Sequence, residues 1–230
     1  MIAICCPSRG LIYSKTVQSI IEGMSHLNSI GLPTRYYTTH DMPIPDSHDF
    51  CVSQALQDGA RKIIFIEEDM YVFPKGYEAL VSSGEAISTL QYNDKNGSPH
   101  GIVHYNEGGE IIWAGLGATC VDSEVFKKLG SPYFRTNVMY KNTKKVIKGD
   151  RAITEYVEIE PRMVYNPETM KQEEKRDSYK YGGQDIDFFT RSRKLGYKIH
   201  LVPDHKAHHF DLVKLGEPHT NNGLHIIRQV

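Results

Sequence analysis

The strongest constraint on this chain is the run Ile63-Ile64-Phe65-Ile66, which is followed at once by Glu67, Glu68 and Asp69. A short run of large apolar residues is typical of a strand buried on both faces, as in a parallel sheet. Because an unpaired buried carboxylate costs several kcal/mol, the three acids must lie where this strand leaves the core. That place is the carboxyl edge of the sheet, where open α/β folds bind their ligands.

The acidic cluster itself indicates a cation. Clustered carboxylates repel one another and hold their charges best with a cation between them, and hard oxygen ligands suit Mg²⁺ or Mn²⁺. In an extended chain Glu67 and Asp69 point to one side and Glu68 to the other, so Glu67 and Asp69 are candidates to share a cation or its nucleotide. A solvated acidic turn is the alternative, and the position directly after a buried strand favours the functional interpretation.

Strand and helix patterns alternate through the first 92 residues. The β-α-β-α-β order of this part predicts right-handed crossovers and a parallel sheet. The predicted fold class is α/β: a single Rossmann-like domain over residues 1–230, with a mainly parallel, mixed sheet flanked by helices. The expected strands are at 1–6, 35–39, 62–66, 86–92, 118–121 and 197–202, with a hairpin over 102–113, and the expected helices are at 14–27, 52–59, 74–84, 122–130 and 185–195.

Two local expectations follow from the spacing of residues. The first helix should bury one apolar stripe along its length. Residues 131–180 are the least regular part, and the charged stretch 168–180 indicates a mobile segment, so we expect 131–181 to act as a lid or acceptor-binding segment. The stripe consists of Val17, Ile20, Ile21, Met24 and Leu27.

Three further groups of residues are candidates for chemistry. The glycines of Gly182-Gly183-Gln184-Asp185 allow backbone N–H groups to approach a ligand, and the helix dipole holds Asp185 ionised in the first turn. Asp187 lies about 200° further round the helix and can instead form a surface pair with Arg191, four residues on. Arg9, after the first strand, can reach a phosphate or a base edge, or it is an ordinary surface arginine.

A histidine cluster follows the last predicted strand. His205, His208 and His209 fall within a stretch of five residues that begins shortly after Val202 and Pro203. One such histidine is a candidate metal ligand. A zinc site lacks nearby cysteines and an HExxH motif, so a mixed carboxylate and imidazole site for manganese fits better. The segment 203–230 is therefore expected to carry a metal ligand and a tail.

Length, charge and cysteines exclude several classes of protein. A chain of 230 residues needs no disulfide or metal for stability, and a net charge of -1 gives no general attraction to nucleic acid or acidic membranes. Four cysteines without a CxxC pair indicate reduced core thiols in a reducing compartment. Without a secretory leader or an apolar run of about 20 residues, we expect a cytoplasmic protein with no membrane span.

Four stretches in this order resemble the nucleotide-sugar-dependent glycosyltransferases of the A-type fold. They are CCPSRG, IIFIEEDMYVFP, GLGATCVDSEVFKKLGSPYF, and GGQDIDFFTRSRKLGYKIHLVP with the histidines after it, and together they span most of the chain. The resemblance implies a metal-dependent, hexosyltransferase-like enzyme. Its cofactors would be Mn²⁺ or Mg²⁺ and a nucleotide-sugar donor, with a UDP-sugar favoured.

The resemblance also implies roles for particular residues. Glu67-Glu68-Asp69 stands where the family has its DxD motif, so Asp69 would bind the metal and Glu67 the ribose or the metal. Asp185 matches the acid that serves inverting members as base. The late metal ligand would be His209 or, as a weaker candidate, His208. Pro7, Ser8 and Arg9 would line the nucleotide pocket with Glu68, Asp49 would lie at its base, and Gly115 and Gly117 would form the floor of the sugar site.

Two departures from the family pattern keep the outcome of the reaction open. Glu67 replaces the usual aspartate, and Gln184 occupies a position that is often acidic, so inverting and retaining chemistry both stand. The alternative function is a nucleotidyltransferase or a protein that binds sugar nucleotides without turnover. Nucleotidyltransferases usually carry a longer Gly- and Lys-rich N-terminal loop than residues 7–10 provide. The acceptor can be a glycan, a protein, a lipid or a modified DNA base, and the oligomeric state is open.

Overall fold

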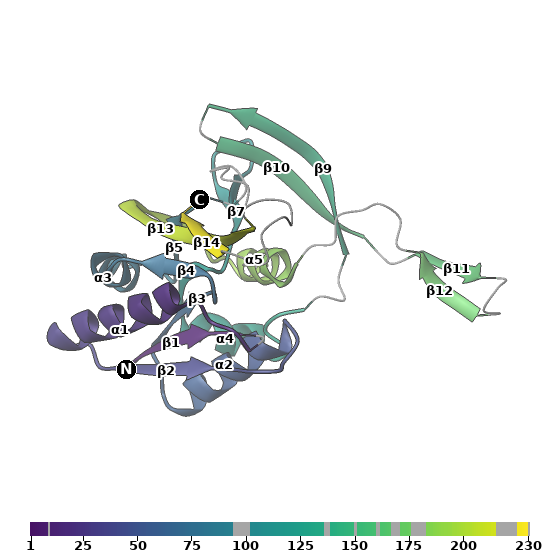
Figure 1. Ribbon diagram of the computed structural model, residues 1–230. Helices are drawn as coiled ribbons and strands as arrows, with labels where there is room; N and C mark the ends of the chain where they lie inside the picture. Colours follow the sequence, from purple (N-terminus) through teal and green to yellow (C-terminus); the bar gives the residue numbers. More distant parts are fainter. Residues whose placement is uncertain are drawn as a thin grey trace.

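In the computed structural model of the chain, helices pack on both sides of a twisted central sheet, and a long hairpin extends away from it (Figure 1). The structure describes residues 1–8, 10–93, 102–135, 139–149, 151–159, 162–166, 171–175, 183–214 and 225–229. The helices are α1 (Ser14–Ser29), α2 (Asp46–Gln57), α3 (Pro74–Ser82), α4 (Ser123–Leu129) and α5 (Gln184–Lys194). The strands of the central sheet are β1 (Ile2–Cys6), β2 (Thr34–Thr38), β3 (Lys62–Ile66), β4 (Met70–Val72), β5 (Ile87–Gln91), β8 (Ala118–Asp122), β13 (His200–Lys214) and β14 (His225–Gln229).

The central sheet is mixed. Its order is β14-β13-β5-β8-β3-β1-β2, with β4 paired to β13. β1 is parallel to β2 and β3, and β5 is parallel to β13. β8 runs in the opposite direction between β3 and β5. The predicted α/β fold with a mixed sheet flanked by helices is therefore confirmed.

Two apolar cores lie on the two faces of this sheet. Alternate residues of β1 and β3 point to opposite faces, so Ala3 and Phe65 pack with α2, α4 and α5, while Ile4 and Ile64 pack with α1 and α3. Ile63 to Ile66 are all fully buried, as the unbroken apolar run predicts. All four cysteines are buried and unbridged, in agreement with the predicted reduced core thiols.

The first helix buries part of the predicted stripe, since Ile20 and Leu27 are buried and Met24 packs against the core. Val17 and Ile21 are exposed, and the buried residues of α1 are Thr16, Ser19, Ile20, Gly23 and Leu27. The Ser19 hydroxyl both donates to the Val72 carbonyl and accepts from its N–H, each at 2.8 Å, and Gly23 leaves room for the Tyr77 ring. Small and polar residues that fit β4 and α3 thus share the buried face with Ile20 and Leu27, because close packing matters at this interface as well as hydrophobicity.

Residues 131–180 contain more regular structure than expected. β9 (Met139–Lys148) and β10 (Arg151–Ile159) form a long antiparallel hairpin, which joins β6 (Val103–Tyr105) and β7 (Ile111–Ala114) in a second sheet. A further hairpin pairs β11 (Arg162–Asn166) with β12 (Lys171–Lys175) and lies away from the central sheet (Figure 1). The adjacent residues Lys145, Val146, Ile147 and Lys148 of β9 are all exposed and show no alternation of apolar and polar side chains, so periodicity did not indicate this strand. A lid role for 131–181 stays a prediction.

The last strand is also longer than predicted. The prediction ended it at Val202 and placed the histidines after it, but β13 continues to Lys214 and contains all three. Pro203 and Asp204, whose φ is 61°, interrupt the pairing with β5 between Leu201 and Lys206, and the strand then pairs antiparallel with β4. Proline and a left-handed residue look like the end of a strand in the sequence, whereas here they mark an irregularity within it.

Candidate functional site

The reversed strand β8 explains why residues from distant parts of the chain meet. Ile66 at the end of β3 is in register with Ala118 at the start of β8, so Glu67 and Gly117 lie side by side. The end of β5, followed by Tyr92, reaches the same edge because β5 also pairs with β8. β13 runs parallel to β5 and carries His209 to this edge. The predicted position of the acids at the carboxyl edge of the sheet is what the structure has.

The three acids form a turn rather than an extended segment. The N–H of Met70 donates to the Glu67 carbonyl at 3.1 Å, which closes the turn between β3 and β4. Glu68 and the other two acids nevertheless have different surroundings, as the sequence predicts. Glu68 bonds to the end of β1, whereas Glu67 and Asp69 lie beside Tyr92.

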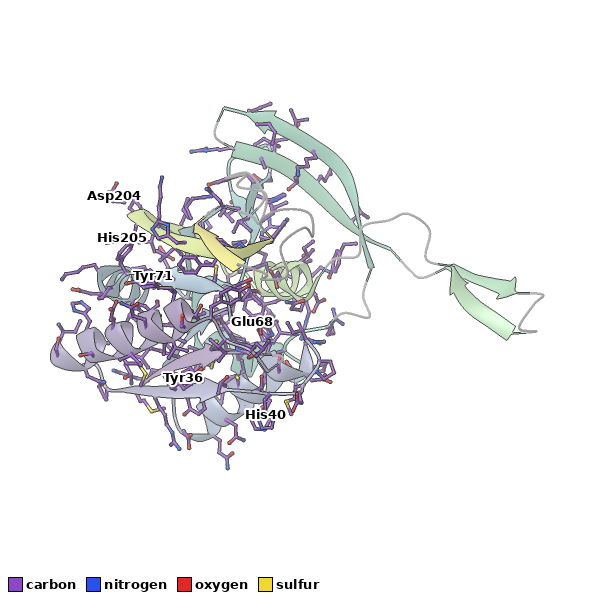
Figure 2. The ribbon with its side chains drawn as sticks, viewed as in Figure 1. Tyr36, His40, Glu68, Tyr71, Asp204 and His205 are labelled. Carbon is purple, nitrogen blue, oxygen red and sulfur yellow. The ribbon has the colours of Figure 1, made fainter. Side chains whose placement is uncertain are left out.

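The first of these surroundings lies at the carboxyl ends of β1 and β2. The Ser8 hydroxyl donates to Glu68 Oε2 at 3.1 Å, and the Ser8 N–H donates to Thr39 Oγ1 at 3.1 Å. Figure 2 shows Glu68 near the centre of the molecule, and Tyr36 on β2, which is separated by β1 from the strand that leads to Glu68. Pro7 is buried in the same place, and Arg9 lies outside the described residues. Pro7, Ser8 and Glu68 are therefore brought together, and Thr39 is a member that the sequence did not indicate.

Asp69 and His209 form the most closely defined pair of the site. His209 Nε2 lies 3.2 Å from Asp69 Oδ2, and the two residues are 5 % and 7 % exposed. The pairing of β4 with β13 places His209 opposite Met70, next to Asp69. His209 Nδ1 lies 3.3 Å from the Asn93 carbonyl, so the Nδ1–H tautomer donates there and directs Nε2 toward the acid. His208 points to the other face of the strand, where its ring contacts Phe73 at 5.4 Å.

Tyr92 lies between these groups and was not singled out in the sequence. It is 3 % exposed, and its Oη accepts a hydrogen bond from the Gly117 N–H at 3.1 Å. A Cβ atom at Gly115 would lie 2.1 Å from this oxygen, and one at Gly117 would lie 2.9 Å from it and 3.0 Å from Glu67 Oε2. These glycines therefore make room for Tyr92. This steric requirement explains the glycines without the sugar-site floor that the family resemblance implies.

The phenol of Tyr92 is surrounded by negative charge. Burial, followed by the charges of Glu67, Asp185 and Asp69, raises the pKa of Tyr92 well above its ordinary value. The Tyr92 ring also meets the His209 ring edge to face, with centroids 6.0 Å apart. One tyrosine thus connects the acid turn, the start of α5 and the histidine of β13. The sequence does not indicate this role, because buried tyrosines at strand ends are common and only the folded structure shows the neighbours of Tyr92.

Asp185 lies in the first turn of α5, as predicted. Its Oδ1 atom is buried and has no hydrogen-bond partner among the described residues. Burial raises the pKa of Asp185 from 3.8 to about 6, while hydrogen bonds from the backbone of Leu116 and of Asp185 itself act to lower it. A carboxyl group with such a pKa is ionised at neutral pH and can accept a proton. Gly183 precedes the helix, and Gly182 lies outside the described residues.

Two other acids considered in the sequence have structural partners. Asp49 Oδ1 accepts hydrogen bonds from the N–H groups of Tyr133 and Phe134 at 3.0 and 2.9 Å, so it fixes the loop after α4. Burial raises the pKa of Asp49, although both backbone bonds oppose that effect. A place for Asp49 at the base of a nucleotide pocket stays a prediction.

Asp187 is fully buried and binds the guanidinium of Arg135, with Nε 3.2 and 3.0 Å from its two oxygens. Tyr140 donates to it at 3.1 Å, and Arg191 pairs with it at 3.3 Å. The predicted Arg191 pair exists, but it is buried rather than on the surface. Asp187 therefore joins α5 to the start of β9 and takes no part in the cluster around Tyr92.

The donor atoms of Asp69 and His209 fit a divalent cation. No group of three or more His, Cys, Asp and Glu side chains within the described ranges is arranged to hold a metal ion. Two neighbouring ligands of an octahedral ion with bonds of about 2.1 Å lie about 3 Å apart, and the Asp69 and His209 atoms are 3.2 Å apart. His209 Nε2 is buried and makes no hydrogen bond to a described residue. A cation held by this pair would need further ligands from a bound ligand or water.

Comparison with known proteins shows a shared fold at low identity. No protein-family model and no curated protein matches the chain. Among solved structures, it is similar to A197 from STIV, with a TM-score of 0.54, 15% identity, and coverage of 91% of this chain and 85% of that chain. This likeness shows a common fold and no more.

Two further likenesses are weaker. The structure of a Drosophila β1,4-galactosyltransferase 7 mutant with manganese, UDP-Gal and xylobiose has a TM-score of 0.46 at 12% identity, covering 88% of this chain and 65% of that one. A putative glucose-1-phosphate thymidylyltransferase from Bacillus anthracis has a TM-score of 0.37 at 13% identity, covering 57% and 74%. Likenesses at this level carry no argument about activity. No helix within the described part of the chain is long and apolar enough to cross a membrane.

Proposed function

We propose that this protein is a metal-dependent glycosyltransferase of the A-type fold, which moves a sugar from a nucleotide diphosphate sugar to a hydroxyl acceptor. The observation that carries the proposal is the buried pair of Asp69 and His209, 3.2 Å apart at the carboxyl edge of the sheet. Glu67 and Asp185 add negative charge near Tyr92, whose ring packs against His209. A divalent cation would offset these negative charges and those of the diphosphate that it binds.

The proposed roles follow from the positions of the side chains. Asp69 and His209 would hold Mn²⁺ or Mg²⁺, which when bound stabilises the negative charge that develops on a departing diphosphate. Ser8 and Glu68, at the ends of β1 and β3, would contact the nucleotide, with a UDP-sugar as the favoured donor. Glu67, which directly precedes Glu68 and Asp69 in the chain, would bind the ribose or the metal.

Asp185 is the proposed base of an inverting reaction. With a pKa of about 6, its carboxylate is present at neutral pH and can take the proton of an acceptor hydroxyl as that oxygen attacks the sugar. Its buried Oδ1 has no described hydrogen-bond partner and so can accept this bond. The alternative function, binding or forming a sugar nucleotide without transfer, keeps the same ligands and needs no base.

The test is incubation with a panel of nucleotide sugars and Mn²⁺, with release of nucleoside diphosphate as the readout. The Asp69→Asn variant should lose Mn²⁺-dependent nucleotide binding in calorimetry and should keep its melting temperature near that of the wild type. Glu85→Gln, which changes an exposed acid just before β5 at the opposite edge of the sheet, is the control and should bind normally. Unchanged nucleotide affinity in Asp69→Asn would count against the metal site. Release of pyrophosphate from a nucleoside triphosphate and a sugar phosphate would favour the nucleotidyltransferase.

A further inference from the structure

Tyr92 is a residue of the site to which the proposed function assigns no role. It is 3 % exposed at the end of β5, and its phenol occupies the space that side chains at Gly115 and Gly117 would fill. Glu67, Asp69 and Asp185 all act on it electrostatically, and His209 packs against its ring. An ordinary core tyrosine does not need two glycines beside its hydroxyl.

The hydrogen-bond inventory of Tyr92 leaves one group unused. A phenolic oxygen can accept a hydrogen bond and donate one. Tyr92 Oη accepts from the Gly117 N–H at 3.1 Å. No described residue accepts a hydrogen bond from the Tyr92 hydroxyl in return. Because a buried donor without a partner costs about 1–3 kcal/mol, such a group points to something that binds there.

The chemistry of the neighbouring groups identifies the class of partner. Ionised carboxylates only accept hydrogen bonds, so Glu67, Asp69 and Asp185 supply no hydrogen-bond donor to the oxygens of a bound sugar. The Tyr92 hydroxyl, which accepts from the Gly117 N–H, has its own hydrogen to donate and supplies the missing donor. The glycines hold it by steric fit and by the Gly117 N–H, so its position is fixed before a ligand arrives.

We propose that the Tyr92 hydroxyl donates a hydrogen bond to a hydroxyl oxygen of the sugar in the bound nucleotide sugar, which makes Tyr92 a specificity-determining residue. This inference rests on the proposed function, because it takes the sugar nucleotide as the ligand. It differs from the implied floor at Gly115 and Gly117: the glycines position the tyrosine, and the tyrosine contacts the sugar.

The experiment compares two UDP-hexoses, which differ only in the sugar, with UDP, which has none. Calorimetry with Mn²⁺ measures the affinities of UDP-glucose, UDP-galactose and UDP for the wild type, Tyr92→Phe and Tyr77→Phe. Tyr77 is an equally buried tyrosine whose hydroxyl lies 3.1 Å from Ser19 Oγ, so its variant is the matched control. Tyr92→Phe should weaken the better UDP-hexose about tenfold, the effect of one hydrogen bond, and leave UDP unchanged. Tyr77→Phe should change neither affinity.

A ligand-side measurement on the wild type keeps the test independent of how well the variant folds. Among monodeoxy analogues of the better UDP-hexose, the one that lacks the contacted hydroxyl should bind the wild type about tenfold more weakly and should bind Tyr92→Phe as the parent sugar does. Equal losses for UDP and UDP-hexose in Tyr92→Phe, or no loss at all, would overturn the role of Tyr92 while nucleotide-sugar binding stands. A wild type that binds no UDP-hexose more tightly than UDP would overturn the role of Tyr92, and failure to bind any nucleotide sugar would remove the proposed function as well.

Discussion

Replacing Asp185 by asparagine should stabilise this protein while it removes the proposed base. Burial of the carboxyl group holds its pKa at about 6 instead of 3.8. A group whose folded pKa is raised favours the folded state below the unfolded pKa, and this advantage is lost as pH rises through the folded pKa. The wild type therefore carries a cost above about pH 6 that Asp185→Asn, which does not ionise, avoids.

The size of this effect follows from the displaced pKa. A shift from 3.8 to about 6 corresponds to at most about 3 kcal/mol. The Asp185 side chain keeps some contact with solvent, so we expect a gain of about 2 kcal/mol in the free energy of unfolding at pH 7.5. The gain should shrink to about 0.5 kcal/mol at pH 4, where the folded carboxyl group is protonated and the unfolded one is about half ionised.

Urea unfolding between pH 4 and pH 8, in EDTA and without nucleotide, measures this difference directly. Asp187→Asn is the matched control two residues further along α5, because Asp187 is bound by Arg135 and Arg191 and its loss should cost about 3 kcal/mol at pH 7.5. If Asp185 served only as a charge at a helix start, Asp185→Asn would instead lose about 0.3–1 kcal/mol. A loss of that size at pH 7.5 would refute the reasoning.

Three other predictions address activity, packing and acid stability. Asp185→Asn should lower transfer at least about 10²-fold with donor affinity little changed, as steady-state kinetics and a donor titration would show; full activity would end its assignment as base. Gly23→Ala should cost about 1–3 kcal/mol in thermal unfolding, because its Cβ would lie 2.5 Å from the buried Tyr77 ring, whereas exposed Ser25→Ala on the same helix should cost nothing. Burial lowers the pKa of His48 to about 3, so the free energy of unfolding should fall by about 2 kcal/mol between pH 6.5 and 4.5 from this group, and His48→Phe should remove that part of the pH dependence in urea melts.

Much of the fold could be predicted from local patterns. The four apolar residues before Glu67 define a buried strand, and the β-α-β-α-β order places its end at the ligand-binding edge. The patterns failed where a tertiary contact decided the outcome. Ser19 and Gly23 are buried in α1 because of their fit to Val72 and Tyr77, and no periodicity in the sequence of α1 contains that information.

The site could be predicted only in part, for a similar reason. Acids after a strand and a histidine near a late strand are visible in the sequence, and the structure brings Asp69 and His209 together. The direction of β8 is not visible, and it is this direction that places Gly117 beside Glu67 and Tyr92. In the sequence alone, Gly115 and Gly117 suggest space for a ligand. In the structure, Tyr92 of the same chain occupies the space beside them.

The pairing of β4 with β13 has a consequence for the order in which the molecule is made. His209 contacts Asn93 across 116 residues of sequence, so the imidazole reaches the acid turn only after most of the chain has left the ribosome. Until β13 pairs with β4, Glu67 and Asp69 lack the histidine that faces them in the folded protein. Bringing together residues this far apart in the sequence has an entropic cost that local contacts do not have. A nascent chain that ends before β13 therefore has the acids of the site but not the strand that completes it.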